Sequence, residues 1–353
     1  MAEDIRMDSH KLIYHPDTVA RWLKGENIYP IEMEISPSGA CNHRCVFCAV
    51  DYIGYRPDFL EKNTILRDVA QMSRKGLKSV VCSGEGEPLL NKDMPDIANG
   101  IKACGVDVAM STNGALFTRE KLQDCLNAFT WVRYSVASME EASYDRIQRG
   151  KAGDLGRVKE NLSEAVRVKK DKGLRTTLGV QCLLLPDNMH QLPDMARQLR
   201  EIGVDYLTVK PYSQHLHSEN AFEIDYGEML ELEQELRQFV AEDFSVYFRA
   251  NAMKKVHHEK CYHKCHGLPF MTHIDARGDV WPCVAHIGTE GFCYGNIYKQ
   301  TFEEIWEGDK RQRAVQKLYS LEINEICREA CRLDEINRYL DALKHPGGHV
   351  NFI

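Results

Sequence analysis

The sequence has no apolar run approaching the ~20 residues that a membrane-spanning helix needs. Its first eleven residues mix acidic and basic side chains without a hydrophobic stretch, so they do not form a secretory signal. Internal repeats and low-complexity segments are also missing. Because hydrophobic residues make up 43% and charged residues 27%, both near globular averages, disorder is excluded as well. We therefore expect a globular cytoplasmic protein without a membrane partner.

A concentrated basic patch is also missing. The 353 residues include 45 Lys and Arg against 52 Asp and Glu, which gives a net charge of -7 dispersed along the chain. The short basic stretches at 169–172 and 254–258 are typical of solvated helix faces. Nothing resembles the basic footprint of a nucleic-acid-binding protein, so no nucleic-acid partner is expected.

Segments typical of strands and helices alternate from about residue 30 to about residue 215, which predicts a parallel sheet with crossover helices. The expected strands are 30–35, 78–82, 106–111, 131–136, 175–183 and 206–209, and the expected helices are 63–74, 92–103, 118–126, 156–170 and 189–202. Six such units predict an α/β fold, a partial (β/α)6 barrel that does not close. Ligands of such folds bind at the carboxyl ends of the strands.

The pattern changes after the sixth strand. A long amphipathic helix is expected over 226–239 and a strand over 244–249, followed by a hairpin at 271–281 and helices over 301–307 and 325–343. We therefore predict three parts: an N-terminal extension at 1–29, the partial barrel at 30–255 and a small α+β domain at 256–353.

Thirteen cysteines are a heavy load for a reducing compartment, where metal ligands, catalytic thiols or buried thiols are more common than disulfides. Four cysteines stand singly among apolar neighbours and are expected to be buried structural residues: Cys82, Cys104, Cys125 and Cys182. The other nine fall into two clusters: Cys41, Cys45 and Cys48, then Cys261, Cys265, Cys283, Cys293, Cys327 and Cys331. Two clusters suggest two metal sites.

The first cluster directly follows the first expected strand, so its three thiolates are placed at the carboxyl edge of the sheet. Three cysteines leave one iron of a four-iron cluster without a protein ligand, and that open position can bind another molecule. A zinc site is the alternative, with His43 as a fourth ligand to Cys41, Cys45 and Cys48.

This C-x3-C-x2-C spacing, with the aromatic Phe47 before the last cysteine, resembles the signature of the radical SAM superfamily. The segment 83–88 at the end of the second strand resembles the superfamily's GGEP motif, and 112–114 and 132–138 resemble its third- and fourth-strand segments. Ala137 stands where many relatives carry Asp. The resemblance implies contacts to S-adenosylmethionine (SAM) from Phe47, Gly84, Glu85, Gly86, Glu87, Asn113, Ser135 and Gln181.

The resemblance also implies a mechanism. SAM would chelate the open iron of a 4Fe-4S cluster, and a reductant such as flavodoxin or ferredoxin would supply the electron that breaks its C5′–S bond. The resulting 5′-deoxyadenosyl radical would abstract a hydrogen atom from the substrate.

The C-terminal third resembles the SPASM and twitch domains, which hold auxiliary iron-sulfur clusters. Cys265, twelve residues, Gly278, four residues and Cys283 reproduce their spacing, and Cys327 and Cys331 would complete a four-thiolate site with both thiols on one helical face. The fuller run of late cysteines is missing, so one auxiliary 4Fe-4S cluster is expected. Cys261 is an alternate ligand. Cys293 is expected to be structural, or a hydrogen-atom donor in an epimerase.

Lys210 and Tyr212 end the sixth strand and are candidate catalytic residues that grip a polar substrate or the SAM carboxylate; a plain strand-ending loop is the alternative. The nearby histidines, His215 among them, are expected to face solvent, with contacts to the substrate as the alternative. We expect oxidation or epimerisation of a small polar molecule such as a sugar or aminocyclitol. The alternatives are modification of a ribosomally made peptide and, in another class, an iron-sulfur redox or binding protein without SAM chemistry.

Overall fold

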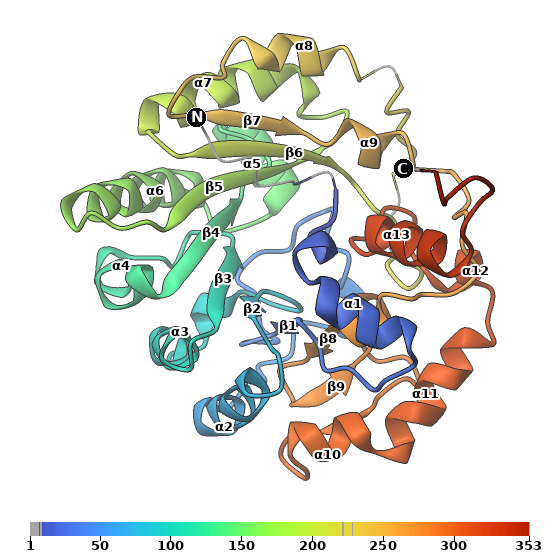
Figure 1. Ribbon diagram of the computed structural model, residues 1–353. Coiled ribbons are helices and arrows are strands. Elements are labelled where there is room, and N and C mark those ends of the chain that lie inside the picture. Colours follow the sequence, from blue (N-terminus) through green and yellow to red (C-terminus); the bar gives the residue numbers. More distant parts are fainter. Residues whose placement is uncertain (1–6, 8, 221, 228, 353) are drawn as a thin grey trace.

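The computed structural model describes residues 7, 9–220, 222–227 and 229–352, and its framework is one ten-stranded sheet (Figure 1). Seven strands run parallel in chain order: β1 (Glu32–Ile35), β2 (Ser79–Cys82), β3 (Asp107–Thr112), β4 (Phe129–Ser135), β5 (Thr177–Leu184), β6 (Tyr206–Pro211) and β7 (Ser245–Phe248). The predicted α/β class with six βα units is confirmed. The strand expected over 244–249 adds a seventh parallel strand beside β6.

Amphipathic helices cover the outer face of the curved sheet (Figure 1): α2 (Lys62–Ser73), α3 (Met94–Ala103), α4 (Arg119–Cys125), α6 (Asp154–Asp171), α7 (Leu192–Ile202) and α8 (Leu232–Arg237). In α7 the buried residues are Leu192, Met195, Ala196 and Leu199, a helical spacing that places one apolar stripe on the sheet. The helix ends at Gly203, whose φ of 90° suits a residue without a side chain. The outer face of the sheet is therefore fully occupied, and the inner face is left for a ligand.

The C-terminal hairpin continues the same sheet. β8 (Met271–Ile274) pairs in parallel with β1, in the register Glu32 to Met271 and Ile35 to Ile274. β9 (Asp279–Trp281) and β10 (Gly295–Asn296) follow antiparallel. The predicted hairpin is present, but it extends the barrel sheet rather than forming a sheet of its own. The domain boundary near residue 255 stays a prediction.

Two expected helices differ from the structure. The helix over 226–239 is reduced to α8, and residue 228 lies outside the described residues. The helix over 325–343 is divided into α12 (Ile323–Ile326) and α13 (Asp334–Lys344), because Cys327 adopts an extended backbone and Cys331 accepts the Leu333 N–H at 3.3 Å. The prediction that Cys327 and Cys331 share a helical face is therefore wrong.

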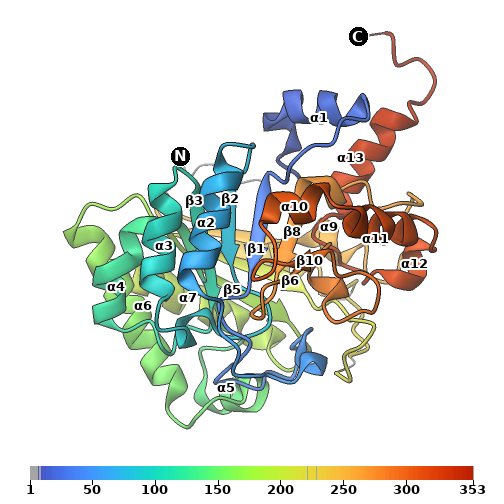
Figure 2. The same ribbon diagram turned by 90° about the horizontal axis from the view of Figure 1, so that it is seen from below.

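Helices that the sequence did not indicate complete the fold: α1 (Pro16–Leu23), α5 (Glu141–Gln148), α9 (Ala250–Met253) and α11 (Asp309–Tyr319), the last following the expected α10 (Phe302–Glu307). α1 lies beside α13 in both views (Figures 1 and 2), and Trp22 and Leu340 share a buried cluster with Phe270. Most of the described part of the predicted N-terminal extension thus packs against the C-terminal part of the chain. No helix among the described residues is long and apolar enough to cross a membrane.

Candidate active site

A cavity of about 300 Å³ opens at the carboxyl ends of the parallel strands. It collects side chains from the loops and strand ends of β1 to β6, as expected for a parallel α/β sheet. Twelve of the thirteen residues predicted for the catalytic and SAM site line it: Cys41, Cys45, Phe47, Cys48, Gly84, Glu85, Gly86, Glu87, Asn113, Ser135, Gln181 and Lys210.

The cysteine loop after β1 is anchored on both sides. The Val46 N–H donates to the carbonyl of Ile147 in α5 at 2.9 Å, and the Arg44 guanidinium stacks 4.1 Å from the Tyr55 ring centroid. Figure 2 shows this loop lying next to α5. These contacts hold the three thiols toward the cavity.

His43, the fourth ligand of the zinc alternative, does not join the three thiols in a single-ion site within the described residues, although its buried Nδ1 has no hydrogen-bond partner. Its Nε2 lies 3.1 Å from the Asp154 carboxylate of α6, and the side chain is buried. Among the residues that the structure describes, no group of three or more His, Cys, Asp or Glu side chains is arranged to hold a single metal ion. The donor set therefore suits a multi-iron cluster better than a mononuclear ion.

Burial raises the pKa of the Cys41 thiol to about 12, and it also raises the pKa values of Cys45 and Cys48. Three thiolates crowded in such a place need a cationic partner, which iron supplies. The residues therefore fit an iron-sulfur cluster held by three cysteines with one iron position facing the cavity.

The Gly84–Glu87 turn after β2 is packed so tightly that only glycine fits at two positions. Gly84 has a φ of +93°, and a Cβ there would lie 2.0 Å from the Ser36 Oγ. A Cβ on Gly86 would lie 2.1 Å from the carbonyl oxygen of Ala40, which also accepts the Glu87 N–H at 2.8 Å. The turn thus supports the backbone that leads into the cysteine loop.

The two acids of this turn have different partners. The buried Glu87 carboxylate accepts the Thr112 hydroxyl at 2.6 Å and the Asn113 N–H at 2.7 Å, which joins the ends of β2 and β3. The Glu85 carboxylate accepts the Ala276 N–H at 2.8 Å in the β8–β9 turn. Glu85 therefore connects the barrel to the C-terminal hairpin.

Ser135 and Gln181 are neighbours in register across β4 and β5. Both line the cavity, and neither side chain has a hydrogen-bond partner among the described residues. Phe47 borders the same cavity with its partly buried ring. A polar ligand with a flat apolar part would find an apolar surface and two available hydrogen-bonding groups here.

A second cavity of about 140 Å³ adjoins the first, and five residues line both: Phe47, Ala49, Leu183, Lys210 and Arg328. Tyr212 lines the second cavity, and its hydroxyl donates to the Asn220 carbonyl at 2.7 Å, with the Gln214 side-chain oxygen 3.0 Å away. These contacts position the loop after β6, and the catalytic role of Tyr212 stays a prediction.

Four C-terminal thiols converge: Cys265, Cys283, Cys327 and Cys331. Each influences the ionisation of the others, and a hydrogen bond from Cys327 lowers the pKa of Cys331. This set fits a four-thiolate cluster. Cys331 also lines the second cavity.

Two other cysteines lie apart from this group. Cys261 is exposed and accepts a hydrogen bond from the Arg338 guanidinium at 2.9 Å, so it is not drawn into the four-thiol set. Cys293 donates to the Gly295 carbonyl at 3.4 Å and lines neither cavity. Its geometry gives no support to a role as hydrogen-atom donor.

Sequence reasoning missed a charged network at the base of the site. The Arg332 guanidinium, next to Cys331, lies 2.6 Å from the buried Glu34 carboxylate of β1 and also pairs with Glu32. Arg328 was missed as well. The available signals were an acid inside a strand, one arginine between two predicted ligands and another directly after the second.

Buried histidines were also missed. His215 was expected in solvent, yet it is 2% exposed and stacks on the Tyr52 ring at 4.7 Å. Its ring nitrogen lies 3.1 Å from the Ala285 carbonyl beside the auxiliary site, and burial lowers its pKa to about 4. No local sequence signal distinguishes it from the exposed histidines nearby.

Comparison with known proteins matches both parts of this site. The profile of the radical SAM superfamily matches residues 35–199, and that of the SPASM iron-sulfur cluster-binding domain matches residues 265–332. A probable GTP 3′,8-cyclase of Methanococcus maripaludis is 27% identical over 66% of this chain and 74% of its own length. Archaeal relatives of that name are covered over 55% to 74% of their lengths.

Other relatives match more of the chain. A tungsten-containing aldehyde ferredoxin oxidoreductase cofactor-modifying protein of Pyrococcus furiosus is 22% identical over 82% of this chain and 86% of its own. Streptococcus suis SuiB bound to S-adenosylmethionine superposes with a TM-score of 0.68 at 16% identity, over 95% of this chain and 79% of SuiB. At that identity the likeness concerns the fold alone.

Proposed function

This chain belongs to the radical SAM superfamily and carries a SPASM iron-sulfur cluster-binding domain, and on that premise we propose that it dehydrogenates a small polar molecule. Cys41, Cys45 and Cys48 would hold the cluster, and SAM bound there would supply, with an electron from a protein such as flavodoxin or ferredoxin, the chemistry that removes one hydrogen atom from the substrate. A second electron and a proton then leave the substrate, so that a CH–OH group becomes a carbonyl.

One observation carries the dehydrogenation. Cys331, a member of the four-thiol set, lines the same 140 Å³ cavity as Phe47 and Lys210, and both of these also line the cavity of the three-cysteine loop. A substrate bound there would touch Cys331 and lie next to the first cavity. This proximity supports the four-thiol site as the acceptor of the second electron.

The size of the second cavity supports a small substrate. The first cavity, of about 300 Å³, would hold SAM, and the second, of about 140 Å³, lies below the ~300–1,000 Å³ range of ligand pockets. An extended peptide would need more room, so modification of a ribosomally made peptide is the weaker alternative. Epimerisation would need a hydrogen-atom donor, and Cys293 does not line either cavity.

Apolar and aromatic side chains lie at and near the junction of the two cavities. Phe47 and Leu183 line both cavities, and Tyr52 and His215 stack on each other and contact the Ile287 and Ala285 carbonyls. Excluding water protects a radical from being quenched.

The test is anaerobic incubation of the reconstituted protein with SAM and dithionite. We expect 5′-deoxyadenosine and methionine, and neither from the variant in which Cys41, Cys45 and Cys48 are all alanine. Absence of both products from the wild type would rule out SAM chemistry and leave an iron-sulfur redox or binding protein.

A second measurement identifies the reaction. With deuterated sugars or aminocyclitols as candidate substrates, deuterium should move into 5′-deoxyadenosine. In D2O the product of a dehydrogenation gains no carbon-bound deuterium, whereas that of an epimerisation does. Solvent deuterium in the product would therefore overturn the dehydrogenation proposal.

A further inference from the structure

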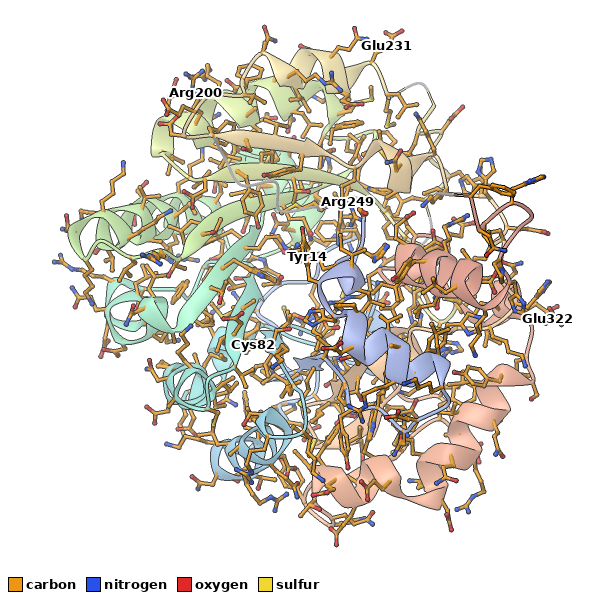
Figure 3. The ribbon with its side chains drawn as sticks, viewed as in Figure 1. Tyr14, Cys82, Arg200, Glu231, Arg249 and Glu322 are labelled. Atoms are coloured by element: carbon orange, nitrogen blue, oxygen red, sulfur yellow. The ribbon has the colours of Figure 1, made fainter. Side chains whose placement is uncertain are left out.

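The wall of the second cavity carries many cationic side chains that have no role in the reaction proposed above. Five cationic residues line the 140 Å³ cavity, namely Lys210, Arg249, Lys255, Arg328 and Arg332, against three acidic ones, Glu329, Asp334 and Glu335. Figure 3 shows Arg249 near the centre of the molecule, whereas Arg200 lies on its outer rim. The cations thus come from four places in the chain: the end of β6, the end of β7, the segment just after α9 and the loop around Cys331.

The acids of this wall already have partners. Lys255 pairs with Asp334 at 3.2 Å and with Glu335, and the Glu329 carboxylate lies 3.2 Å from His257. Glu32 and Glu34 of β1 pair with Arg332. The two other acids of the first cavity, Glu85 and Glu87, accept hydrogen bonds from the Ala276 N–H and from Thr112 and Asn113, and neither forms an ion pair with Lys210 or Arg328 within the described residues.

Lys210 and Arg328 are the two cations that line both cavities, and within the described residues neither has a carboxylate within ion-pair distance. Arg133 of β4 stands behind them; its Nε is buried without a hydrogen-bond partner. Burial, then Arg133 and Arg328, hold the pKa of Lys210 well below its ordinary value. Uncompensated cations in a partly buried place are unfavourable unless an anion completes them.

We propose that Lys210 and Arg328 bind an anionic group of the substrate, a phosphate or a carboxylate, in the cavity between the two cluster sites. This inference rests on the function proposed above and adds the chemical class of its substrate. A negative group there would face a fork of guanidinium donors from Arg328 and the ammonium of Lys210, the arrangement that recognises carboxylate and phosphate. The uncharged end of the substrate would then extend toward Phe47 and the first cavity.

Two competing explanations make different predictions. Lys210 could instead hold the carboxylate of SAM, in which case its loss weakens SAM binding. Alternatively, the sole role of Arg328 is to balance the negative charge of the four-thiol cluster, in which case its loss leaves the affinity for small anions unchanged. The auxiliary cysteines Cys283 and Cys331 are indeed within electrostatic range of Arg328.

The experiment is calorimetric titration of the anaerobic holoprotein, with both clusters and saturating SAM, by three probes on one three-carbon skeleton. Glycerol 3-phosphate tests the phosphate, glycerate tests the carboxylate and glycerol is the neutral control. One of the two anions should bind measurably and glycerol should not. Lys210→Gln and Arg328→Gln should each weaken that anion at least about tenfold, since hydrogen bonds to charged groups contribute that much.

Arg200→Gln is the matched control because it removes one exposed positive charge from α7, far from the cavity, and it should leave anion binding unchanged. Lys210→Arg, which keeps the charge, should bind the anion more tightly than Lys210→Gln. Circular dichroism identifies a variant that fails to fold, and the other variant then carries the test.

Three results would overturn the inference: neither anion binds better than glycerol, both glutamine variants retain wild-type anion affinity, or Lys210→Gln loses affinity for SAM by as much as for the anion. Binding needs no turnover, so it is independent of the proposed function. Anion binding without 5′-deoxyadenosine formation would refute only the enzyme, and 5′-deoxyadenosine formation without anion binding would refute only this inference.

Discussion

Replacing Gly86 with alanine should test whether the turn after β2, which borders the cavity, also holds the cysteine loop in position. The added Cβ would lie 2.1 Å from the Ala40 carbonyl oxygen and 2.6 Å from that of Ser38. Real Cβ atoms keep at least 3.0 Å, so the backbone just before Cys41 has to move by about 0.9 Å. Both obstacles are backbone atoms, so no flexible side chain can absorb the clash.

The shift has two measurable consequences. Overpacking of this size costs about 1–3 kcal/mol of unfolding free energy, which urea denaturation can measure. A displacement near 1 Å in a reacting geometry can cost about a hundredfold in rate, so formation of 5′-deoxyadenosine should fall by that order while the auxiliary cluster keeps its iron.

Gly156→Ala is the matched control. Gly156 lies in α6 with a helical backbone, and nothing lies within 4 Å of the added Cβ. That variant should be neutral or more stable by about 0.5–1 kcal/mol, with normal SAM cleavage. Gly86→Ala protein that cleaves SAM at the wild-type rate would refute the argument that this close approach positions the cysteine loop.

Three further changes test other parts of the structure. Arg332→Met should lower the free energy of unfolding in urea by about 3–5 kcal/mol because it leaves the buried Glu34 carboxylate without this guanidinium. The double variant with Glu34→Gln should recover much of that loss. An Arg332→Met protein as stable as the wild type would contradict a stabilising ion pair. The pKa of His215 is about 4 in the folded protein and 6.5 ordinarily, so the unfolded chain takes up the proton first as the pH falls. The free energy of unfolding should therefore decrease between pH 6.5 and pH 4, by up to about 1.4 kcal/mol per pH unit. His215→Phe should flatten that dependence, and an unchanged slope in urea midpoints would count against it. Cys265→Ser should lower iron content by about four atoms per chain, whereas Cys261→Ser should not; equal losses would place Cys261 in the cluster.

Local sequence pattern was sufficient for the elements whose stabilising contacts are local. The six strands and most crossover helices followed from apolar periodicity, and the cysteine loop and glutamate turn followed from their position directly after strands. Twelve of the thirteen predicted catalytic and SAM-site residues line one cavity because parallel strands bring their carboxyl ends to one edge. The roles of those residues stay predictions until tested.

Long-range contacts decided the remainder. The segment 325–343 has strong helical periodicity, yet the chain leaves the helix at Cys327 so that Cys327 and Cys331 can approach Cys265 and Cys283. Pairing of β8 with β1 could not be foreseen, because nothing local indicates which strand edge a hairpin will join. For the same reason, no spacing rule predicts that Lys210 and Arg328, 118 residues apart in the sequence, line the same two cavities.

The parallel pairing of β1 with β8 has a consequence for biosynthesis. The partner of Glu32 is Met271, so one edge of β1 stays unpaired until about 240 more residues have been made. At about 5–20 residues per second, that interval is roughly 10–50 s. An open strand edge flanked by Met33 and Ile35 is prone to pair with another chain. Soluble expression should therefore depend on slow induction, low temperature or chaperone supply, and truncation before residue 271 should leave a nascent barrel that aggregates.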